Sequence, residues 1–143
     1  MQLIYHPLSS FNQQPENTVK LITSRLQLQK RIWRGLAEDG KVFGFDLEEP
    51  LSHDQPFYEC EGSLYILKQE AEAVYAIDLI TLKQAAETAW MIGNLHFSAS
   101  FHEDTLIVPV DPALEKLFIK QSITYREENM VFLPQKNRTA HKH

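Results

Sequence analysis

The sequence is poor in residues that would build a disulfide framework or a phosphate-binding loop. Its 143 residues include one cysteine, Cys60, so no internal disulfide can form. The five glycines are scattered and make no Gly-rich loop, which argues against nucleotide hydrolysis by the chain itself. No apolar run approaches the roughly 18 residues that cross a bilayer, and no charged and apolar leader pattern opens the chain. We therefore expect a cytoplasmic protein with no membrane association.

A strong excess of charge is also absent. Lys and Arg number 14 against 19 Asp and Glu, the net charge is −5, and the basic residues form no stripe that would neutralise phosphates. Nucleic acid is therefore not expected as a partner. The adjacent pairs Glu48-Glu49 and Glu127-Glu128 would point to opposite sides of a strand, so we interpret them as surface groups. Cys60 lies in a strand pattern and is interpreted as a packed residue.

The first half of the chain has the pattern of strands and turns. Asp39-Gly40 separates two runs of alternating apolar residues, and Glu61-Gly62 interrupts the run FYECEGSLYIL, so each pair predicts a hairpin turn. No helical periodicity is visible from about residue 19 to 70. We therefore predict a β-rich domain over residues 1–71. The alternating residues are Leu26 and Leu28 before the first turn, and Phe43, Phe45 and Leu47 after it.

The second half begins with the short apolar strand AVYAI and a helix. Thr81 and Gln84 have the spacing of a capping box, which predicts the start of this helix. Gly93 is expected to end it by taking a left-handed φ. The apolar residues at helical spacing are Leu82, Ala85, Ala86, Ala89 and Trp90.

Four further segments complete the second half. Residues 95–101 alternate as a strand, and a turn at 102–104 leads into the strand TLIVPV. Asp111-Pro112 predicts the start of a second helix, whose apolar face is Leu114, Leu117 and Phe118. SITYREENMVFL supplies a last strand. The order βαββαβ over residues 72–133 is ferredoxin-like, and the fold class is α+β. Residues 134–143 are polar, lack periodicity and are expected to form a flexible tail.

His96 stands at the start of the alternating segment 95–101. One face of a strand there would carry Leu95, Phe97, Ala99 and Phe101, and the other would carry His96, Ser98, Ser100 and His102. The first face is the expected core face, so His96 should point to solvent. Two interpretations remain open. His96 is either a surface histidine bonded to a nearby serine or a metal ligand, since neutral imidazole commonly binds metals.

One histidine supplies too few ligands for a transition metal. His102 would lie roughly 20 Å away along a strand at about 3.3 Å per residue, too far to share an ion with His96 in one protomer. Two sources remain. One is a second His96 across a two-fold axis, and the other is the pair His141 and His143 in the tail.

These features together resemble the UreE family, the nickel metallochaperones among the urease accessory proteins. The resemblance covers roughly residues 20–133, and its markers are AEDGKVFGFDL, MIGNLH and VDPALEKLF. Gly93-Asn94-Leu95-His96 is the most specific element, and AHKH is a short version of the family's histidine tail.

The chain departs from the family pattern at three places. Leu95 replaces the arginine that usually stands between the asparagine and the histidine. The segment LIVPVDPAL before the second helix has none of the histidines that some relatives carry, so secondary metal sites are not expected there. The Arg-Gly and Gly-Asp pairs of the family's first domain are replaced around Glu49-Pro50 and Asp54-Gln55.

The resemblance implies a peptide-binding-like first domain and a ferredoxin-like metal-binding second domain. It implies that His96 is a nickel ligand shared by two protomers of a homodimer joined through the second domain. Tail histidines complete the site in some relatives, and the corresponding metal-ligand candidates here are His141 and His143. Ni²⁺ would be cargo, and Zn²⁺ or Cu²⁺ would compete for the same imidazoles. The implied partners are urease apoprotein and other urease accessory proteins, including the maturation GTPase.

Two other functions are weighed against nickel transport. In the first, the chain is a non-enzymatic adaptor whose β domain binds a peptide or protein, and His96 is an incidental surface residue. In the second, the chain is an enzyme that uses one histidine. The second is the weaker hypothesis, because no partner residue for His96 can be named. The chain is therefore predicted not to be an enzyme.

Overall fold

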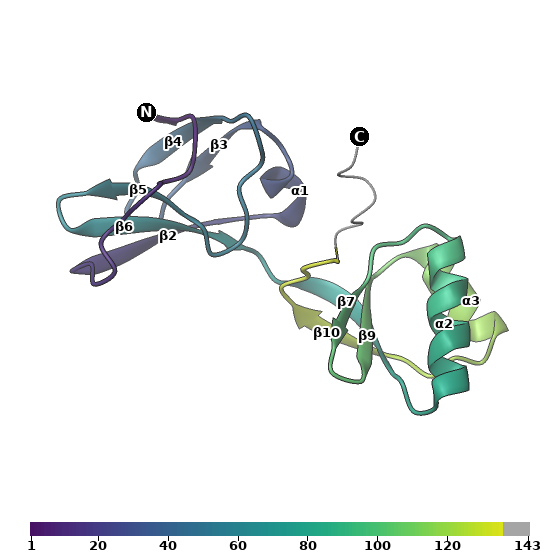
Figure 1. The fold of residues 1–143 in the computed structure, drawn as a ribbon. Helices are drawn as coiled ribbons and strands as arrows, with labels where there is room; N and C mark the ends of the chain where they lie inside the picture. The colour runs from purple at the N-terminus through teal and green to yellow at the C-terminus, as the bar shows by residue number, and fades with distance from the viewer. Residues whose placement is uncertain (136–143) are drawn as a thin grey trace. The chain divides into compact units, whose positions relative to one another are not determined.

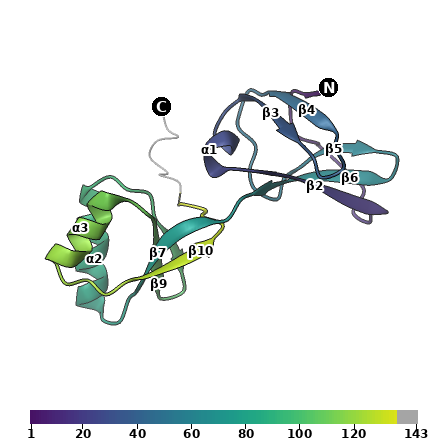
Figure 2. The same cartoon turned by 180° about the vertical axis from the view of Figure 1, so that it is seen from behind.

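The computed structural model describes residues 1–135, which form a mixed α+β structure rich in strands (Figures 1 and 2). The chain divides into two compact units, the first over Met1–Glu70 and the second from Ala71 onward. Among the described residues, no helix has the length and apolar character needed to cross a membrane.

The first unit consists of two three-stranded sheets and one short helix. The sheets have the strand orders β1-β4-β3 and β2-β6-β5, with β1 parallel to β4, β2 parallel to β6, and the other pairs antiparallel. The elements are β1 (Gln2–Ile4), β2 (Asn17–Thr23), α1 (Arg25–Leu28), β3 (Ile32–Leu36), β4 (Val42–Asp46), β5 (Pro56–Cys60) and β6 (Ser63–Gln69).

Both predicted hairpins are confirmed. β3 and β4 are joined by a turn in which Gly40 donates its N–H to the carbonyl of Ala37 and takes a φ of +91°. Asp39 is not left-handed there, so this turn is the three-residue type with one left-handed glycine. β5 and β6 are joined by Glu61 and Gly62, which both have positive φ, as a two-residue hairpin turn requires.

The expectation that no helix lies between residues 19 and 70 is wrong. Leu26 and Leu28 belong to α1, whose N-cap is Ser24, and the Ser24 Oγ accepts the N–H of Gln27 at 3.1 Å. The first strand of the hairpin begins only at Ile32. Two alternating leucines are compatible with one turn of helix as well as with a strand, and the capping serine decides the outcome here.

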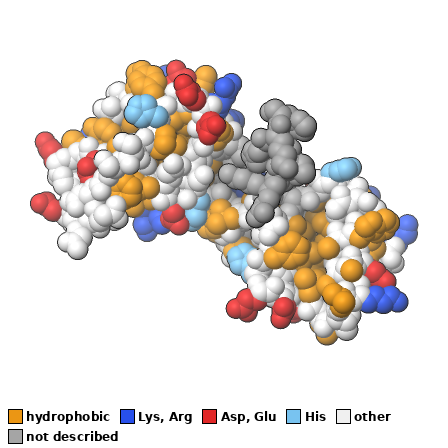
Figure 3. Space-filling view, in the orientation of Figure 1, with side chains coloured by type: hydrophobic (Ala, Val, Ile, Leu, Met, Phe, Trp, Pro, Cys, Tyr) orange, Lys and Arg blue, Asp and Glu red, His pale blue; other side chains and the backbone are white. Residues whose placement is uncertain are grey.

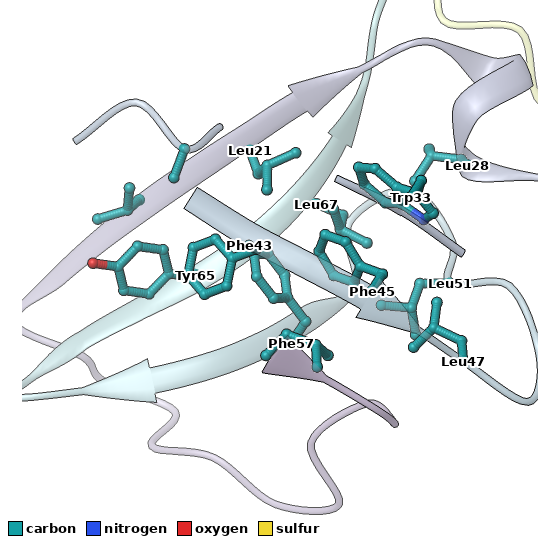
Figure 4. Packing of buried hydrophobic residues seen from close by; sticks show 13 residues of the cluster. Leu21, Leu28, Trp33, Phe43, Phe45, Leu47, Leu51, Phe57, Tyr65 and Leu67 are labelled. Carbon is teal, nitrogen blue, oxygen red and sulfur yellow. The ribbon is translucent and has the colours of Figure 1, made fainter. Parts of the chain in front are cut away.

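The core of the first unit is aromatic and lies between its two sheets (Figure 4). Trp33 stacks on Phe45 with ring centroids 4.1 Å apart, and Phe43 meets Phe57 edge to face at 5.0 Å. These rings come from alternate positions of β3, β4 and β5, so the opposite positions of β3 and β4 face away from the core. Burial of each ring contributes roughly 2–3 kcal/mol, which is enough to fix the register of these strands.

The second unit has the element order predicted from the sequence, strand-helix-strand-strand-helix-strand. Its sheet has the order β10-β7-β9-β8 and is antiparallel throughout. Figures 1 and 2 show α2 and α3 together on one face of this sheet. The elements are β7 (Glu72–Asp78), α2 (Leu82–Asn94), β8 (Ser100–His102), β9 (Thr105–Pro109), α3 (Pro112–Lys120) and β10 (Arg126–Met130).

The two faces of this sheet are covered differently. Ile92 of α2 and Leu114 and Phe118 of α3 pack on the helix-covered face. On the other face, Phe132 is fully buried against three sheet residues, Val74, Ala76 and Ile107. Phe132 follows β10, so the chain returns across the sheet after its last strand.

The prediction of a strand over residues 95–101 is largely wrong. α2 extends to Asn94, Leu95 is its C-cap, and β8 begins only at Ser100. Within β8 the expected faces are exchanged, because Ser100 is buried and Phe101 is exposed. Ser100 pairs with Ile107, which belongs to the face that Phe132 covers, and this pairing explains its burial.

Candidate metal centre

The first helix of the second unit is held firmly at its beginning. Thr81 is the N-cap, and its Oγ1 accepts the N–H of Gln84 at 3.1 Å, as predicted. The Gln84 side chain accepts the N–H of Ile80 at 2.8 Å and donates to the carbonyl of Asp78 at 3.0 Å. Gln84 therefore ties α2 to the end of β7, whereas a standard capping box would return to the N-cap itself.

The other end of α2 positions His96. The N–H of Leu95 donates to the carbonyl of Ile92 at 3.1 Å, and the N–H of His96 donates to the carbonyl of Gly93 at 3.0 Å. His96 has a φ of +61°, so the left-handed residue after the helix is His96. The expectation that Gly93 takes this conformation is wrong, because Gly93 is still helical and the left-handed position follows the C-cap.

The left-handed backbone at His96 is unfavourable for a side chain, although histidine tolerates it better than most residues. The cost is roughly 1 kcal/mol for a residue with a Cβ. Strain of this kind occurs at functional positions, and in the described chain Asp54, Glu61, Glu103 and Ser122 also have a positive φ. The left-handed φ therefore matters at His96 for the direction it gives the side chain. Here it sets the direction of the Cα–Cβ bond, so the exposed imidazole of His96 leaves the chain at an angle fixed by the helix end.

The electrostatic setting of His96 suits a cation. The last turn of α2 contains no basic residue, so no Lys or Arg of that turn neutralises the partial negative charge of its terminal carbonyls. A metal ion held by His96 would lie near this negative end. The described residues 1–135 contain no group of three or more His, Cys, Asp and Glu side chains that could hold an ion. His96 therefore belongs to no ready-made set of three such ligands within this part of the protomer.

A stripe of exposed small and apolar residues runs along α2 toward His96. We call it the α2 stripe, and its members are Leu82, Ala86, Trp90 and Gly93. The sequence groups Leu82, Ala85, Ala86, Ala89 and Trp90 as one apolar helix face, but the residues that α2 buries are Thr88 and Ile92. Leu82 and Trp90 are 89% and 68% exposed. Figure 3 shows hydrophobic side chains gathered over this part of the second unit.

Gly93 has free space around it. A Cβ placed on Gly93 would meet no atom within 4 Å, so the protomer's own packing does not require a glycine there. Helical glycine is less stable than helical alanine by roughly 0.5–1 kcal/mol. Gly93 therefore lowers the stability of α2, and no packing contact inside the protomer requires a glycine there.

The end of the described chain lies beside the segment that follows His96. The N–H of Gln135 donates to the carbonyl of Ala99 at 2.8 Å. Ala99 is three residues after His96, and it precedes the edge strand β8. His141 and His143, the two tail histidines of the sequence prediction, lie outside the described residues.

Two other histidines of the described chain, His102 and His53, have different settings from His96. His102 is exposed at the end of β8, and the estimate of 20 Å from His96 assumed a continuous strand that the structure does not have. His53 uses both ring nitrogens within its own unit: Nδ1 accepts the N–H of Gln69 at 2.9 Å, and Nε2 lies 3.3 Å from the Asp54 carboxylate. A hydrogen bond from Lys68 holds the pKa of Asp54 below its usual range. His53 is therefore a structural residue.

A cavity of about 530 Å³ lies between α2 and residues 121–126. Its charged wall is an ion-pair cluster in which Arg126 donates to Asp78 at 2.8 Å and to Glu128 at 2.7 Å. The Thr105 hydroxyl also donates to Asp78. These bonds lower the pKa of Asp78, with the Arg126 bond as the larger cause. Both carboxylates are thus already paired with Arg126, and the cluster secures β10 and β9 to β7.

Comparison with known proteins identifies the second unit. The model of the family described as "UreE urease accessory protein, C-terminal domain" matches residues 72–143, half of the chain. Proteins named "Urease accessory protein UreE" match nearly all of it. The Bacillus cereus protein is 28% identical over 138 residues, which cover 95% of this chain and 91% of that protein. The Geobacillus kaustophilus protein is 26% identical over 131 residues, covering 90% and 88%.

Proposed function

The chain belongs to the UreE family of urease accessory proteins, and on this premise we propose that it is a nickel metallochaperone that delivers Ni²⁺ to the urease active site during assembly. The family consists of accessory chaperones and not of enzymes, and its role is in urease maturation. The observation that carries the proposal is the position of His96. Its imidazole is exposed and directed by a left-handed backbone, beside the negative end of a helix.

Two protomers supply the ligands in this proposal. The second unit is the ferredoxin-like metal-binding domain, and it forms a homodimer through the α2 stripe. A two-fold axis near the C-terminal end of α2 brings the two His96 rings together and covers Trp90 and Leu82. Two-fold dimers use the same patch on both copies, and exposed apolar patches commonly mark such interfaces. Gly93 supports this arrangement, because the missing Cβ leaves room for a second helix to approach.

The tail supplies the remaining ligands. Gln135 is bonded beside Ala99, and the six residues from there to His141 span at most about 20 Å. His141 and His143 are therefore within reach of His96 on the same protomer. Two imidazoles on a short tether have a high effective concentration at the site, on the order of millimolar. Release of tethered ligands would also allow the ion to pass to an acceptor.

The remaining assignments are part of the proposal and are supported by family membership. The acceptors are urease apoprotein and the other urease accessory proteins, including the maturation GTPase, and the compartment is the cytoplasm. The first unit is the peptide-binding-like domain that contacts these partners. Ni²⁺ is the cargo, although Zn²⁺ and Cu²⁺ compete for the same ligands.

Titration calorimetry with Ni²⁺ at neutral pH tests the metal site. We expect the full chain to bind at micromolar affinity or tighter, and His96→Ala to lose the tightest site. His102→Ala is the matched control, because it removes another exposed histidine of the same unit and should leave the site intact. Truncation after Lys136 should leave one weaker Ni²⁺ per dimer and reduce delivery to apo-urease. Absence of Ni²⁺ binding to the full chain would contradict the metallochaperone proposal and favour the adaptor function.

Sedimentation tests the dimer separately. Trp90→Glu places a charge in the centre of the α2 stripe and should give a monomer in the absence of metal. Ile119→Glu is the control, because Ile119 is 71% exposed on α3 and lies outside the stripe. Equal dimerisation of the two variants would place the dimer interface elsewhere.

A further inference from the structure

The sheet β1-β4-β3 of the first unit has an outer face that no other described element of that unit covers. Phe43 and Phe45 of β4 point into the core, so Val42, Gly44 and Asp46 point outward. On β3 the outward residues are Ile32, Arg34 and Leu36, because Trp33 between them is buried. On β1 and its two flanking residues they are Met1, Leu3 and Tyr5. These nine residues are called the outer face.

The outer face is more apolar than a sheet face in contact with water should be. Exposed faces of antiparallel sheets normally carry polar side chains. Six of the sixteen large hydrophobic residues that are exposed in the described chain lie here, and Ile32 is the most exposed of them at 72%. They are Met1, Leu3, Tyr5, Ile32, Leu36 and Val42. An exposed apolar cluster on an ordered sheet marks an interaction surface.

The strand register places these residues in three rows. Leu3, Gly44 and Arg34 form the middle row, because Leu3 pairs with Gly44 and Arg34 pairs with Gly44 on the other side. Leu36 pairs with Val42 at one end, and Ile32 pairs with Asp46 at the other. Tyr5 follows β1 on the Asp46 side, and both residues line one shallow pocket.

Gly44 leaves no protruding side chain of its own at the centre of this face. A Cβ on Gly44 would lie 3.0 Å from Met1 Sδ and 3.1 Å from Leu3 Cδ2, so these two side chains lie over the glycine. The face therefore has a flat apolar centre that another flat surface can contact. A flat centre favours a sheet as the partner surface over a protruding loop.

Two charges stand among the apolar residues of the outer face, Arg34 and Asp46. Neither side chain forms an ion pair within the described residues, although they are diagonal neighbours on adjacent strands. Burial of an unpaired charge is strongly unfavourable. A partner surface must therefore present an acidic group over Arg34 and a basic group over Asp46.

A second copy of the same face satisfies both requirements. A two-fold axis lying in the interface along the diagonal from Ile32 to Gly44 places Arg34 of each copy over the second copy's Asp46. The same rotation places Leu3 over Val42 and Leu36 over Tyr5, so apolar residues meet apolar residues. The strands of the two sheets then cross at nearly a right angle, which is one of the two common packings of sheets.

We propose that the outer face of the first unit is an isologous self-association surface, in which two copies pack their β1-β4-β3 sheets together through reciprocal Arg34–Asp46 pairs. The face covers roughly 300 Å² in projection, from strands about 4.8 Å apart and same-face residues about 6.7 Å apart. Its nine residues are also far fewer than the roughly 20–30 residues per partner of a standard stable interface. The association is therefore weak and reversible, and it depends on protein concentration.

Disulfide trapping tests the geometry without reference to metal binding. Ile32→Cys places a thiol on the two-fold axis, where the introduced thiols of two copies meet. Leu26→Cys is the matched control, because Leu26 is 67% exposed on α1 and lies off the outer face. Both are made in full-length chain carrying Cys60→Ser and oxidised with glutathione. We expect a covalent dimer from Ile32→Cys at a rate at least several-fold above that of Leu26→Cys. Equal rates would overturn the proposal.

A charge exchange tests the pairing. In the Ile32→Cys background, Arg34→Asp or Asp46→Arg alone brings like charges together in both reciprocal pairs and should slow trapping roughly tenfold. The two substitutions together restore opposite charges and should restore the rate. Circular dichroism confirms that each variant is folded. Failure of the double variant to recover, or unchanged trapping in both single variants, would overturn the proposal and leave the outer face to a different protein.

Discussion

The backbone N–H of His96 donates to the carbonyl oxygen of Gly93 across 3.0 Å, and this bond closes the last turn of α2 with His96 in the left-handed region. The direction of the imidazole is therefore set by the helix end and requires no packing around the ring. A ligand oriented in this way can remain exposed and still be held in a defined position. The backbone conformation of residue 96 and its imidazole therefore have separate roles, and different substitutions can test each role.

Replacement of His96 by glycine should raise stability and remove metal binding at once. Glycine adopts a left-handed φ without steric cost, so the free energy of unfolding in urea should increase by about 0.5–1 kcal/mol. The same change removes the imidazole, so the tightest Ni²⁺ site should disappear in calorimetry. His96→Ala is the comparison, because it also removes the imidazole but keeps the strained Cβ, and it should gain no stability. Retention of the site in both variants would exclude His96 as a ligand.

Replacement of Gly93 by alanine should have opposite effects on folding and association. The added Cβ meets no atom within 4 Å, and alanine favours the helix, so the protomer should gain about 0.5–1 kcal/mol in free energy of unfolding. In the proposed dimer the same Cβ points at the second helix, so the dissociation constant should rise in sedimentation experiments. Stabilisation with unchanged dimerisation would place Gly93 outside the interface.

The ionised Asp78 should stabilise the folded state at neutral pH, and this stabilisation should be lost in acid. Its pKa is lowered chiefly by the hydrogen bond from Arg126 and further by that from Thr105. A carboxylate with a lowered folded-state pKa stabilises the fold above its unfolded pKa of about 3.9, and the contribution is lost as pH falls through the folded-state value. Asp78→Asn should therefore lower the melting temperature at pH 7, and the difference from the native chain should shrink as pH falls below about 3.9. A difference that persists in acid would point to packing as the cause.

Phe132 should affect both the stability of the second unit and the Ni²⁺ affinity that the tail provides. Phe132→Leu shortens a fully buried side chain on the sheet and should cost roughly 1 kcal/mol or somewhat more. It should also loosen the segment that Gln135 fixes beside Ala99, so Ni²⁺ affinity should fall toward that of the chain truncated after Lys136. Leu133→Ala is the control, because Leu133 is exposed. Unchanged affinity in Phe132→Leu would show that this anchor does not serve the metal site.

Local signals of turns and helix starts could be read reliably from the sequence. Glu61-Gly62 and Gly40 form their hairpin turns, and Asp111 caps α3 with its carboxylate accepting the N–H of Ala113 at 2.8 Å. Each of these depends on a few neighbouring residues, whose φ preferences or hydrogen bonds suffice to define the structure. Ser24 is a signal of the same kind that the alternation of two leucines concealed.

The faces of α2 and of segment 95–101 could not be read in this way. Periodicity shows which residues share a face, but it does not show which face the rest of the fold covers. Trp90 belongs to an apolar face that solvent meets, and Thr88 is buried instead. Ser100 pairs with Ile107 on the face that Phe132 covers, and its burial therefore depends on a residue that comes after β10, far along the sequence. The exposure of His96 was expected, but its left-handed backbone was not, because a glycine three residues earlier was the better candidate.

The hydrogen bond between Gln135 and Ala99 has a practical consequence for handling the protein. Gln135 is fixed beside the segment that carries His96, and His143, to which a carboxyl-terminal tag would be fused, follows only eight positions later in the sequence. A polyhistidine purification tag placed there would add six imidazoles within reach of the proposed nickel site, and its own metal affinity would be counted as the protein's. Stoichiometries measured on such a preparation would describe the tag as much as the native tail. Preparations with the tag at the other end, or with the tag cleaved, would report the native chain.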